Sequence, residues 1–160
     1  MRSLLPLLLA LTFACGGKSP ADLTKEAQSA LDGGDAPKAV TLVDAALAQD
    51  AVKKDAPSAW RLEQVKLDAL AKTGKGAEVL ANLERLAGTN PKQVNAALYR
   101  ALADKVKAAD DTTGAIDILA AGDKRFPADH ATFQEAIDAL KSTGNLDPAE
   151  VERLKALGYL

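Results

Sequence analysis

The chain has 160 residues, of which 48% are hydrophobic and only 4% aromatic, and alanine alone supplies about a fifth of the total. Alanine, leucine, lysine and glutamate favour helices, whereas strands are rich in β-branched and aromatic residues. The composition therefore predicts an all-α protein of about one domain. A formal net charge of −2 excludes the strongly basic surface that binds nucleic acid, so no nucleic acid is expected among the partners.

The first element is a short apolar segment at the N-terminus. Arg2 precedes an apolar run over residues 4–14, which is shorter than the roughly 20 residues that span a bilayer. A basic start followed by an apolar stretch of this length is typical of a secretory signal peptide. We therefore predict a signal peptide over residues 1–14.

Cys15 is the only cysteine of the chain and follows this segment directly, in the sequence ACGG. The stretch resembles the lipobox of bacterial lipoproteins, although Thr12 stands where that family prefers leucine. The resemblance implies cleavage before Cys15 and attachment of a diacylglycerol, usually with an N-acyl chain, that anchors the protein to a membrane. Ordinary cleavage after Ala14, which would leave a free thiol, is the alternative.

The resemblance also implies a location in the bacterial cell envelope. Gly16 stands where an aspartate would favour retention in the inner membrane, so we expect the outer membrane, with the protein facing the periplasm. The polar run that follows is rich in glycine, serine and proline, and we predict a flexible tether over residues 15–22.

From residue 23 onward the chain alternates helical segments with short turns, and we expect about eight helices in pairs. The breaks within the pairs centre on Gly34, Gly74, Asp110 and Gly144, at spacings of 40, 36 and 34 residues. The longer first spacing indicates an insertion or a longer connection at residues 52–58.

Several helix ends carry capping signals. Asp35 is a candidate N-cap with Pro37 in the first turn, and Asp147 with Glu150 can form a capping box. Gly158 can take a left-handed C-cap conformation that folds Tyr159 and Leu160 back over Leu154 or the last open face.

Small and large apolar residues recur in each unit and resemble the tetratricopeptide repeat family. The third unit carries the pattern best, through Tyr99, Leu102, Ala103, Val106, Ala115, Leu119, Gly122 and Pro127. The first carries it through Leu23, Ala27, Ala30, Gly34, Ala39, Val43 and Ala46, and the fourth through Phe133, Leu140, Gly144, Ala149 and Ala156.

This resemblance implies a right-handed superhelix of antiparallel helix hairpins, an α-solenoid of about 3.5–4 units over residues 23–160. A compact helical bundle is the alternative. The second unit matches less well, because the helix that opens it has two apolar stripes. One stripe is formed by Trp60, Leu67 and Leu70, and the other by Leu62, Val65 and Ala69. Two stripes indicate a helix that packs on both sides.

The sequence offers little catalytic chemistry. His130 is the only histidine and lies in a polar turn, so we interpret it as a surface residue. The acidic stretch at 110–117 lacks the alternating ligands of a calcium loop, and KTGKG at 72–76 lacks the spacing of a phosphate-binding loop. We therefore predict no enzyme activity, no metal site and no cofactor.

In the tetratricopeptide repeat family the first helix of each unit lines a groove that binds peptides. The resemblance places in that groove Arg61, Gln64, Asp68, Lys72, Arg100, Asp104, Lys107, Gln134, Asp138 and Lys141. Each aspartate precedes a lysine by three or four residues, so ordinary intrahelical ion pairs on a solvated face are the alternative explanation.

Three functions remain open. The sequence favours a lipid-anchored, non-enzymatic adaptor or scaffold that binds an unknown protein or peptide partner. The first alternative is a structural or assembly subunit whose helical faces are permanently buried in an envelope complex. The second is an enzyme or a carrier of a small ligand.

Overall fold

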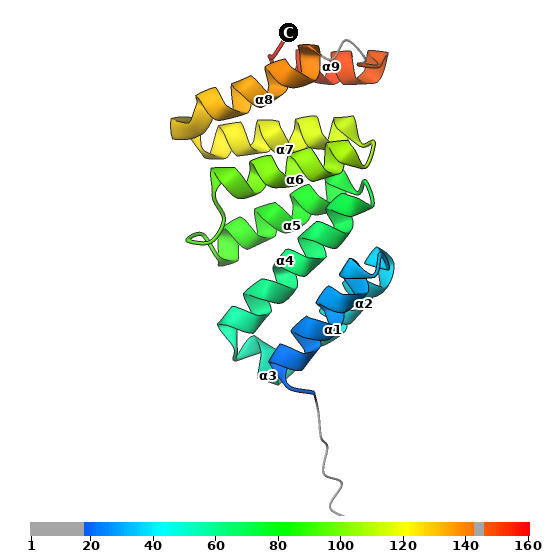
Figure 1. Cartoon of the computed structure of the whole chain (residues 1–160). Coiled ribbons are helices and arrows are strands. Elements are labelled where there is room, and N and C mark those ends of the chain that lie inside the picture. Colours follow the sequence, from blue (N-terminus) through cyan, green and yellow to red (C-terminus); the bar gives the residue numbers. More distant parts are fainter. Residues whose placement is uncertain (1–17, 143–145) are drawn as a thin grey trace, which may run out of the picture.

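The computed structural model describes residues 18–142 and 146–160, and these residues form helices and connecting turns without any strand (Figure 1). The helices are α1 (Pro20–Asp32), α2 (Ala36–Leu47), α3 (Asp50–Lys53), α4 (Ala56–Lys72), α5 (Gly76–Thr89), α6 (Ala96–Ala108), α7 (Thr112–Arg125), the 3-10 helix η1 (Pro127–Asp129), α8 (His130–Ser142) and α9 (Pro148–Ala156). The prediction of an all-α protein is confirmed. The predicted signal peptide, Cys15 and the break at Gly144 lie outside the described residues.

Two boundaries differ from the sequence-based expectation. The Ser19 hydroxyl accepts a hydrogen bond from the Asp22 amide and caps α1, so the helix begins at Pro20 rather than at residue 23. Residues 20–22 therefore belong to the helix and not to the tether expected over 15–22. The additional helix α3 has only four residues and lies in the longer connection expected between the first two units.

The predicted caps of α2 and α9 are confirmed. Asp35 accepts a hydrogen bond from the Lys38 amide at 3.1 Å, and Asp147 and Glu150 form both bonds of a capping box. The turns after α1, α4 and α6 each contain one residue with a positive φ: Gly34 at 83°, Gly74 at 64° and Asp110 at 64°. A left-handed residue ends each of these first helices and reverses the chain into the second.

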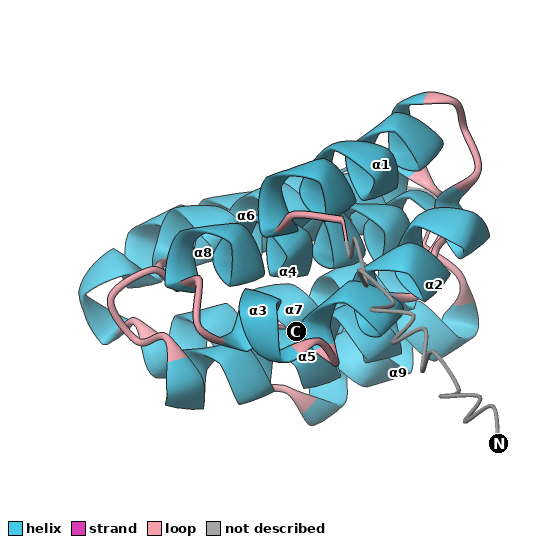
Figure 2. Cartoon of the chain, turned by 90° about the horizontal axis from the view of Figure 1, so that it is seen from below, coloured by secondary structure: helices cyan, strands magenta, loops and turns pink. Residues whose placement is uncertain are grey.

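The main helices form two layers. Figure 2 shows α1, α4, α6 and α8 on one side of the molecule and α2, α5, α7 and α9 on the other. Along the stack, α1 and α2 pack together and both contact α4, while α4 also contacts α5 and α6. Helix α7 contacts α5, α6, α8 and α9, so successive helix pairs lie side by side in chain order (Figure 1).

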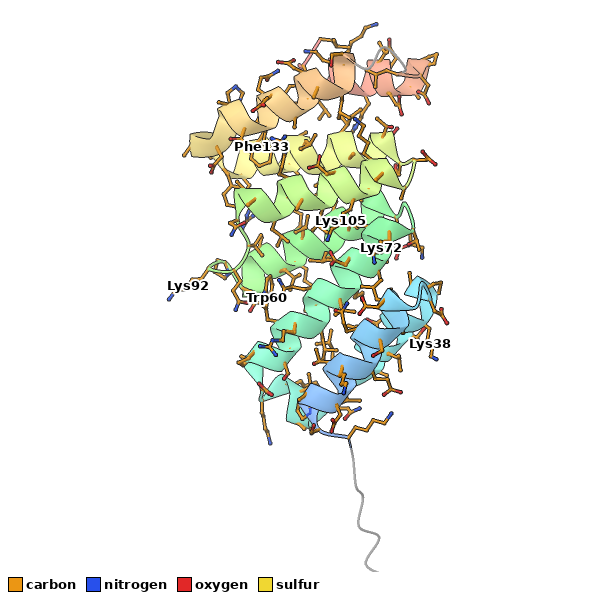
Figure 3. The ribbon with its side chains drawn as sticks, viewed as in Figure 1. Lys38, Trp60, Lys72, Lys92, Lys105 and Phe133 are labelled. Atoms are coloured by element: carbon orange, nitrogen blue, oxygen red, sulfur yellow. The ribbon has the colours of Figure 1, made fainter. Side chains whose placement is uncertain are left out.

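Helix α4 joins two hydrophobic clusters, as its two apolar stripes predicted. Leu62, Val65 and Ala69 belong to the N-terminal cluster formed with α1, α2 and α3. Leu67 and Leu70 belong to the larger C-terminal cluster, against which Trp60 is half-buried (Figure 3). One helix therefore connects the first hairpin to the rest of the molecule.

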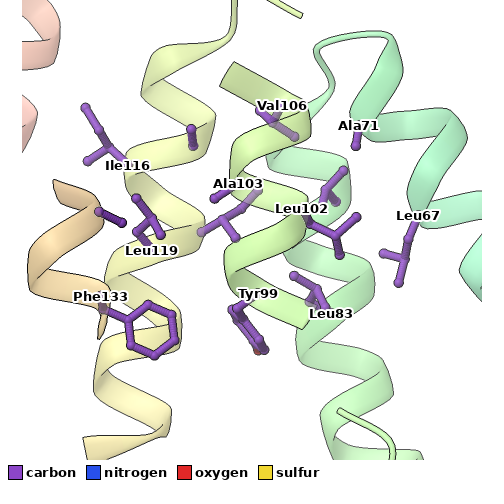
Figure 4. Close-up of a cluster of buried hydrophobic side chains, with 14 of the residues drawn as sticks. Leu67, Ala71, Leu83, Tyr99, Leu102, Ala103, Val106, Ile116, Leu119 and Phe133 are labelled. Atoms are coloured by element: carbon purple, nitrogen blue, oxygen red, sulfur yellow. The ribbon is translucent and has the colours of Figure 1, made fainter. Parts of the chain in front are cut away.

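The centre of the larger cluster lies between α6, α7 and α8 (Figure 4). Tyr99 and Phe133 are both fully buried, and the Tyr99 ring meets the half-buried Phe126 ring edge-on with centroids 5.7 Å apart. Gly122 lies between them, since a Cβ there would come within 2.5 Å of Phe133 and 3.1 Å of Tyr99. The close approach of α7 and α8 therefore requires glycine at this position.

The last two helices depart from the expected hairpin. Helices α8 and α9 each pack on α7 and make no comparable contact with each other. As a result, Ala149 and Ala156 are exposed and do not serve as the packing sites that the repeat pattern predicted.

The C-terminal turn agrees with the sequence only in part. Gly158 has a φ of 83°, and the Tyr159 amide donates to the Leu154 carbonyl at 2.9 Å, as expected for a left-handed C-cap. Tyr159 packs against the core, but Leu160 remains 57% exposed, so the expectation that Leu160 covers the last face is wrong.

Candidate interaction surface

The ten residues predicted to line a groove lie on three helices of one layer. Helix α4 carries Arg61, Gln64, Asp68 and Lys72, helix α6 carries Arg100, Asp104 and Lys107, and helix α8 carries Gln134, Asp138 and Lys141. All ten are exposed or half-buried. Helix α1, which opens the same layer, contributes residues that the prediction did not include.

The charged residues are only partly paired along their own helices. Lys141 lies 2.6 Å from Asp138 within α8. The hydrogen bond from Lys141 lowers the pKa of the Asp138 carboxyl below its usual 3.8, and a hydrogen bond from Gln134 has a lesser effect in the same direction. Asp68, in contrast, accepts a 2.6 Å hydrogen bond from Lys105 of α6 and not from Lys72. Intrahelical pairing therefore accounts for one of the three expected pairs.

Arg100 has a structural contact of its own. Its Nη1 donates to the Thr132 carbonyl of α8 at 2.9 Å, and its Nε is buried without a hydrogen-bond partner in the described residues. This side chain therefore ties α8 to α6. Asp104 and Lys107 directly follow the buried residues Ala103 and Val106 on α6, and they make no hydrogen bond or ion pair to any described residue.

Two hollows lie on this layer. The larger hollow is a cleft of about 620 Å³ between α1 and α4, and a much smaller one of about 60 Å³ lies between α6 and α8. Between these hollows, α4 packs directly on α6 and the Lys105–Asp68 ion pair bridges the two helices (Figure 3). Six of the ten predicted residues therefore border these two hollows, three at each: Arg61, Gln64 and Asp68 at the larger, and Arg100, Asp104 and Lys107 at the smaller.

The cleft between α1 and α4 contains three of the predicted residues, Arg61, Gln64 and Asp68. Its other wall is formed by α1 and lined by Ala21, Thr24, Lys25, Gln28, Ser29 and Asp32. The sequence contained a signal for this wall, because Lys25, Gln28 and Asp32 stand 36 residues before Arg61, Gln64 and Asp68. The same order of basic residue, glutamine and aspartate occurs on both helices.

A second group of polar residues lies near the C-terminus. The Asp123 carboxylate is 2.7 Å from His130 Nδ1 through one oxygen and accepts a 2.7 Å hydrogen bond from the Tyr159 hydroxyl through the other. Burial, together with this bond to Asp123, raises the pKa of Tyr159 to about 12. His130 is exposed as expected, and its contact with Asp123 links the start of α8 to α7.

The hollow beside this group has a volume of about 490 Å³ and is lined partly by Ala120, Pro127 and Leu157. It contains no cysteine, serine or threonine that His130 could activate as a nucleophile. Among residues 18–142 and 146–160, no cluster of three or more histidine, cysteine or acidic side chains is arranged to hold a metal ion.

The chain matches no protein-family model, no curated protein and no solved structure. Of the helices that the structure describes, none is long and apolar enough to span a membrane.

Proposed function

We propose that this protein is a non-enzymatic interaction module of the bacterial cell envelope, anchored by a lipid on Cys15, that binds another protein through the layer of α1, α4, α6 and α8. The observation that carries the proposal is the cleft between α1 and α4, which is open and lined mainly by polar and charged side chains. Several of these side chains, among them Arg61 and Gln64, make no hydrogen bond or ion pair to the described residues.

We further propose that the helix pairs form a short α-solenoid of the tetratricopeptide type. Four hydrogen bonds between neighbouring units support a repeated geometry, because their partners are separated by nearly one unit of sequence. The four pairs are Gly76 and Asp111 (35 residues apart), Asp117 and Arg153 (36), Asp68 and Lys105 (37), and Ala87 and Arg125 (38). Stacked repeats of this kind present extended surfaces for binding.

The scarcity of exposed apolar side chains favours a reversible partner over a permanent one. Among the described residues, Leu160 is the single large hydrophobic side chain that is exposed. Obligate interfaces are larger and more hydrophobic than reversible ones, and they resemble a domain core cut in half. A permanently buried assembly subunit, the alternative, would be expected to expose an apolar face when alone.

The salt dependence of partner binding tests the proposed module against that alternative. The full chain is captured from detergent-solubilised membranes, once after chemical crosslinking in cells and once without the crosslinker. We expect the crosslinked sample to carry a partner protein. Without the crosslinker, we expect high salt to release this partner. Salt screens contacts between exposed charges, whereas hydrophobic contacts persist. A stoichiometric partner that resists salt would indicate an assembly subunit, and the absence of any crosslinked protein would contradict both functions.

The anchor is tested by replacing Cys15 with serine. We expect the variant to move from the membrane fraction to the soluble fraction of the envelope, because a serine hydroxyl cannot form the thioether that holds the diacylglycerol. Two or more acyl chains bind a membrane firmly, since each buried CH₂ contributes about 0.8 kcal/mol. Fractionation, together with labelling by radioactive palmitate, measures the effect.

Gly16→Ala is the matched control, because it alters the neighbouring residue and keeps the cysteine. It should incorporate the label and stay with the membrane. If Cys15→Ser also remained in the membrane fraction, the anchor would have to lie elsewhere and the proposed lipidation would be wrong.

A further inference from the structure

The two walls of the cleft between α1 and α4 carry the same three kinds of side chain in the same order. From the start of each helix toward its end, the order is a basic residue, a glutamine and an aspartate: Lys25, Gln28 and Asp32 on α1, and Arg61, Gln64 and Asp68 on α4. The two helices run in the same direction and are in contact (Figure 1), so on both walls the basic residue lies toward one end of the cleft and the aspartate toward the other. The cleft therefore has a basic end, an amide centre and an acidic end.

The basic end has the larger unsatisfied charge. Neither Lys25 nor Arg61 forms an ion pair or hydrogen bond with a described residue. Lys25 lies close enough to Asp22 to help lower the pKa of that carboxyl, but the hydrogen bonds from Ser19 contribute more. Arg61 has no acidic partner among the described residues, so two cations at this end remain available to an anionic group.

The opposite end keeps a net negative charge. The charge of Asp68 is neutralised by Lys105 at 2.6 Å, whereas Asp32 accepts only a neutral hydrogen bond, from Gln28 Nε2 at 2.8 Å. The amide of Gln64 is exposed and makes no hydrogen bond to the described residues. A side-chain amide both donates and accepts, so it can pair with the backbone of a bound peptide.

The length of the cleft limits the spacing of complementary charges in a ligand. Lys25 and Asp32 are seven residues apart on α1, which corresponds to about 10 Å at 1.5 Å per helical residue. An extended chain rises about 3.3 Å per residue, and its successive side chains point in opposite directions. Two side chains that face the cleft from one extended peptide would therefore stand about two or four positions apart.

We infer that this cleft binds an extended peptide segment of another protein, with an acidic side chain between Lys25 and Arg61 and a basic side chain at Asp32. The peptide backbone between them pairs with the amides of Gln28 and Gln64. Because the two ends of the cleft differ in charge, the ligand binds in one direction. This inference rests on the proposed function and specifies the partner and the place at which it docks.

Selection from a displayed library of random dodecapeptides on the full chain in detergent micelles tests the inference. We expect the enriched peptides to share an acidic and a basic residue two or four positions apart. The affinity of the best synthetic peptide should fall at least tenfold in the double variant Lys25→Glu, Arg61→Glu. Selection on that variant should instead enrich peptides with two basic residues, because the cleft would then be acidic throughout.

The double variant Lys38→Glu, Lys92→Glu is the matched control. It changes the net charge by the same amount at exposed lysines outside the cleft (Figure 3), and the peptide affinity should change less than twofold. Circular dichroism should show the same helix content for both variants, since the four side chains are exposed.

Failure of the inference can be distinguished from failure of the proposed function. Three outcomes of the selection would overturn the inference. The enriched peptides could lack the charge pattern, the wild type and Lys25→Glu, Arg61→Glu could enrich the same peptides, or no peptide could be enriched at all. A salt-sensitive partner captured equally well by the wild type and by Lys25→Glu, Arg61→Glu would also overturn it, and the interaction module would stand. Absence of any crosslinked partner of the wild type would overturn the proposed function.

Discussion

Replacing Gly76 by alanine is expected to lower the free energy of unfolding by about 3 kcal/mol, because the new methyl group would meet backbone. A Cβ at Gly76 would lie 2.6 Å from Gly114 Cα and 2.6 Å from Asp111 Oδ2. Gly76 opens α5, and Gly114 lies in the first turn of α7. The two helices would have to separate, since neither obstacle is the free end of a flexible side chain.

The expected cost has two parts. Inserting a methylene-sized group into a packed interface costs about 1–3 kcal/mol. Separation of the helices would also weaken the 2.8 Å hydrogen bond from the Gly76 amide to Asp111 Oδ2, and an unsatisfied buried N–H costs about 1–3 kcal/mol. Urea unfolding of the chain from Lys18 onward, followed by circular dichroism, measures the sum.

Gly88→Ala is the matched control because it makes the same substitution in the same helix. Gly88 lies near the end of α5, is exposed, and has no atom within 4 Å of the position a Cβ would take. Alanine loses less backbone entropy than glycine on helix formation, so this change should stabilise the protein by about 0.5–1 kcal/mol. Equal effects at the two positions would show that α5 and α7 are not held at the described distance.

The helix pairs could be predicted from the sequence because local signals determine where helices start and stop. Gly34 and Gly74 could be recognised as turn residues, and Asp35 and Asp147 as caps, since each acts within a few residues of chain. The two-sided packing of α4 was also predictable, because two apolar stripes on one helix require two neighbours. The fold class follows from these local patterns.

The arrangement of the last two helices and the shape of the surface could not be predicted in the same way. Whether α9 packs on α8 or on α7 depends on the angles between helices, and similar apolar stripes are compatible with both. The same limit applies to the cleft: periodicity places Gln64 and Asp68 on the solvent side of α4, but the opening between α1 and α4 follows from how the helices cross. The ion pair between α4 and α6 involves Lys105, which lies outside the predicted set.

Asp111 illustrates a contact that sequence spacing hides. In the sequence it is one more aspartate before a helix, and it does cap its own helix α7, with Oδ1 accepting from the Gly114 amide at 2.8 Å. Its second oxygen accepts from the Gly76 amide, 35 residues earlier. The N-cap residue of α5 is Lys75, which supplies no side-chain hydrogen bond, so Asp111 caps the helix of the preceding unit as well.

Asp111→Ala is therefore expected to lower the free energy of unfolding by about 2–3 kcal/mol, roughly twice or three times the usual cost of losing one cap. Asp35→Ala is the matched control, because Asp35 caps only its own helix, through the Lys38 amide, and should cost about 1 kcal/mol. Both variants are measured by the same urea unfolding.

Asp111→Asn separates the two roles of the carboxylate. An amide keeps a single oxygen acceptor and its NH₂ group cannot accept, so one of the two helix starts loses its partner while the side-chain volume is conserved. Its stability should fall between those of the wild type and Asp111→Ala. If Asp111→Ala cost no more than Asp35→Ala, the bond to Gly76 would contribute nothing, and α5 and α7 would be joined by apolar packing alone. If it costs more, one carboxylate stabilises two successive units together, and the loss of either helix start weakens the other.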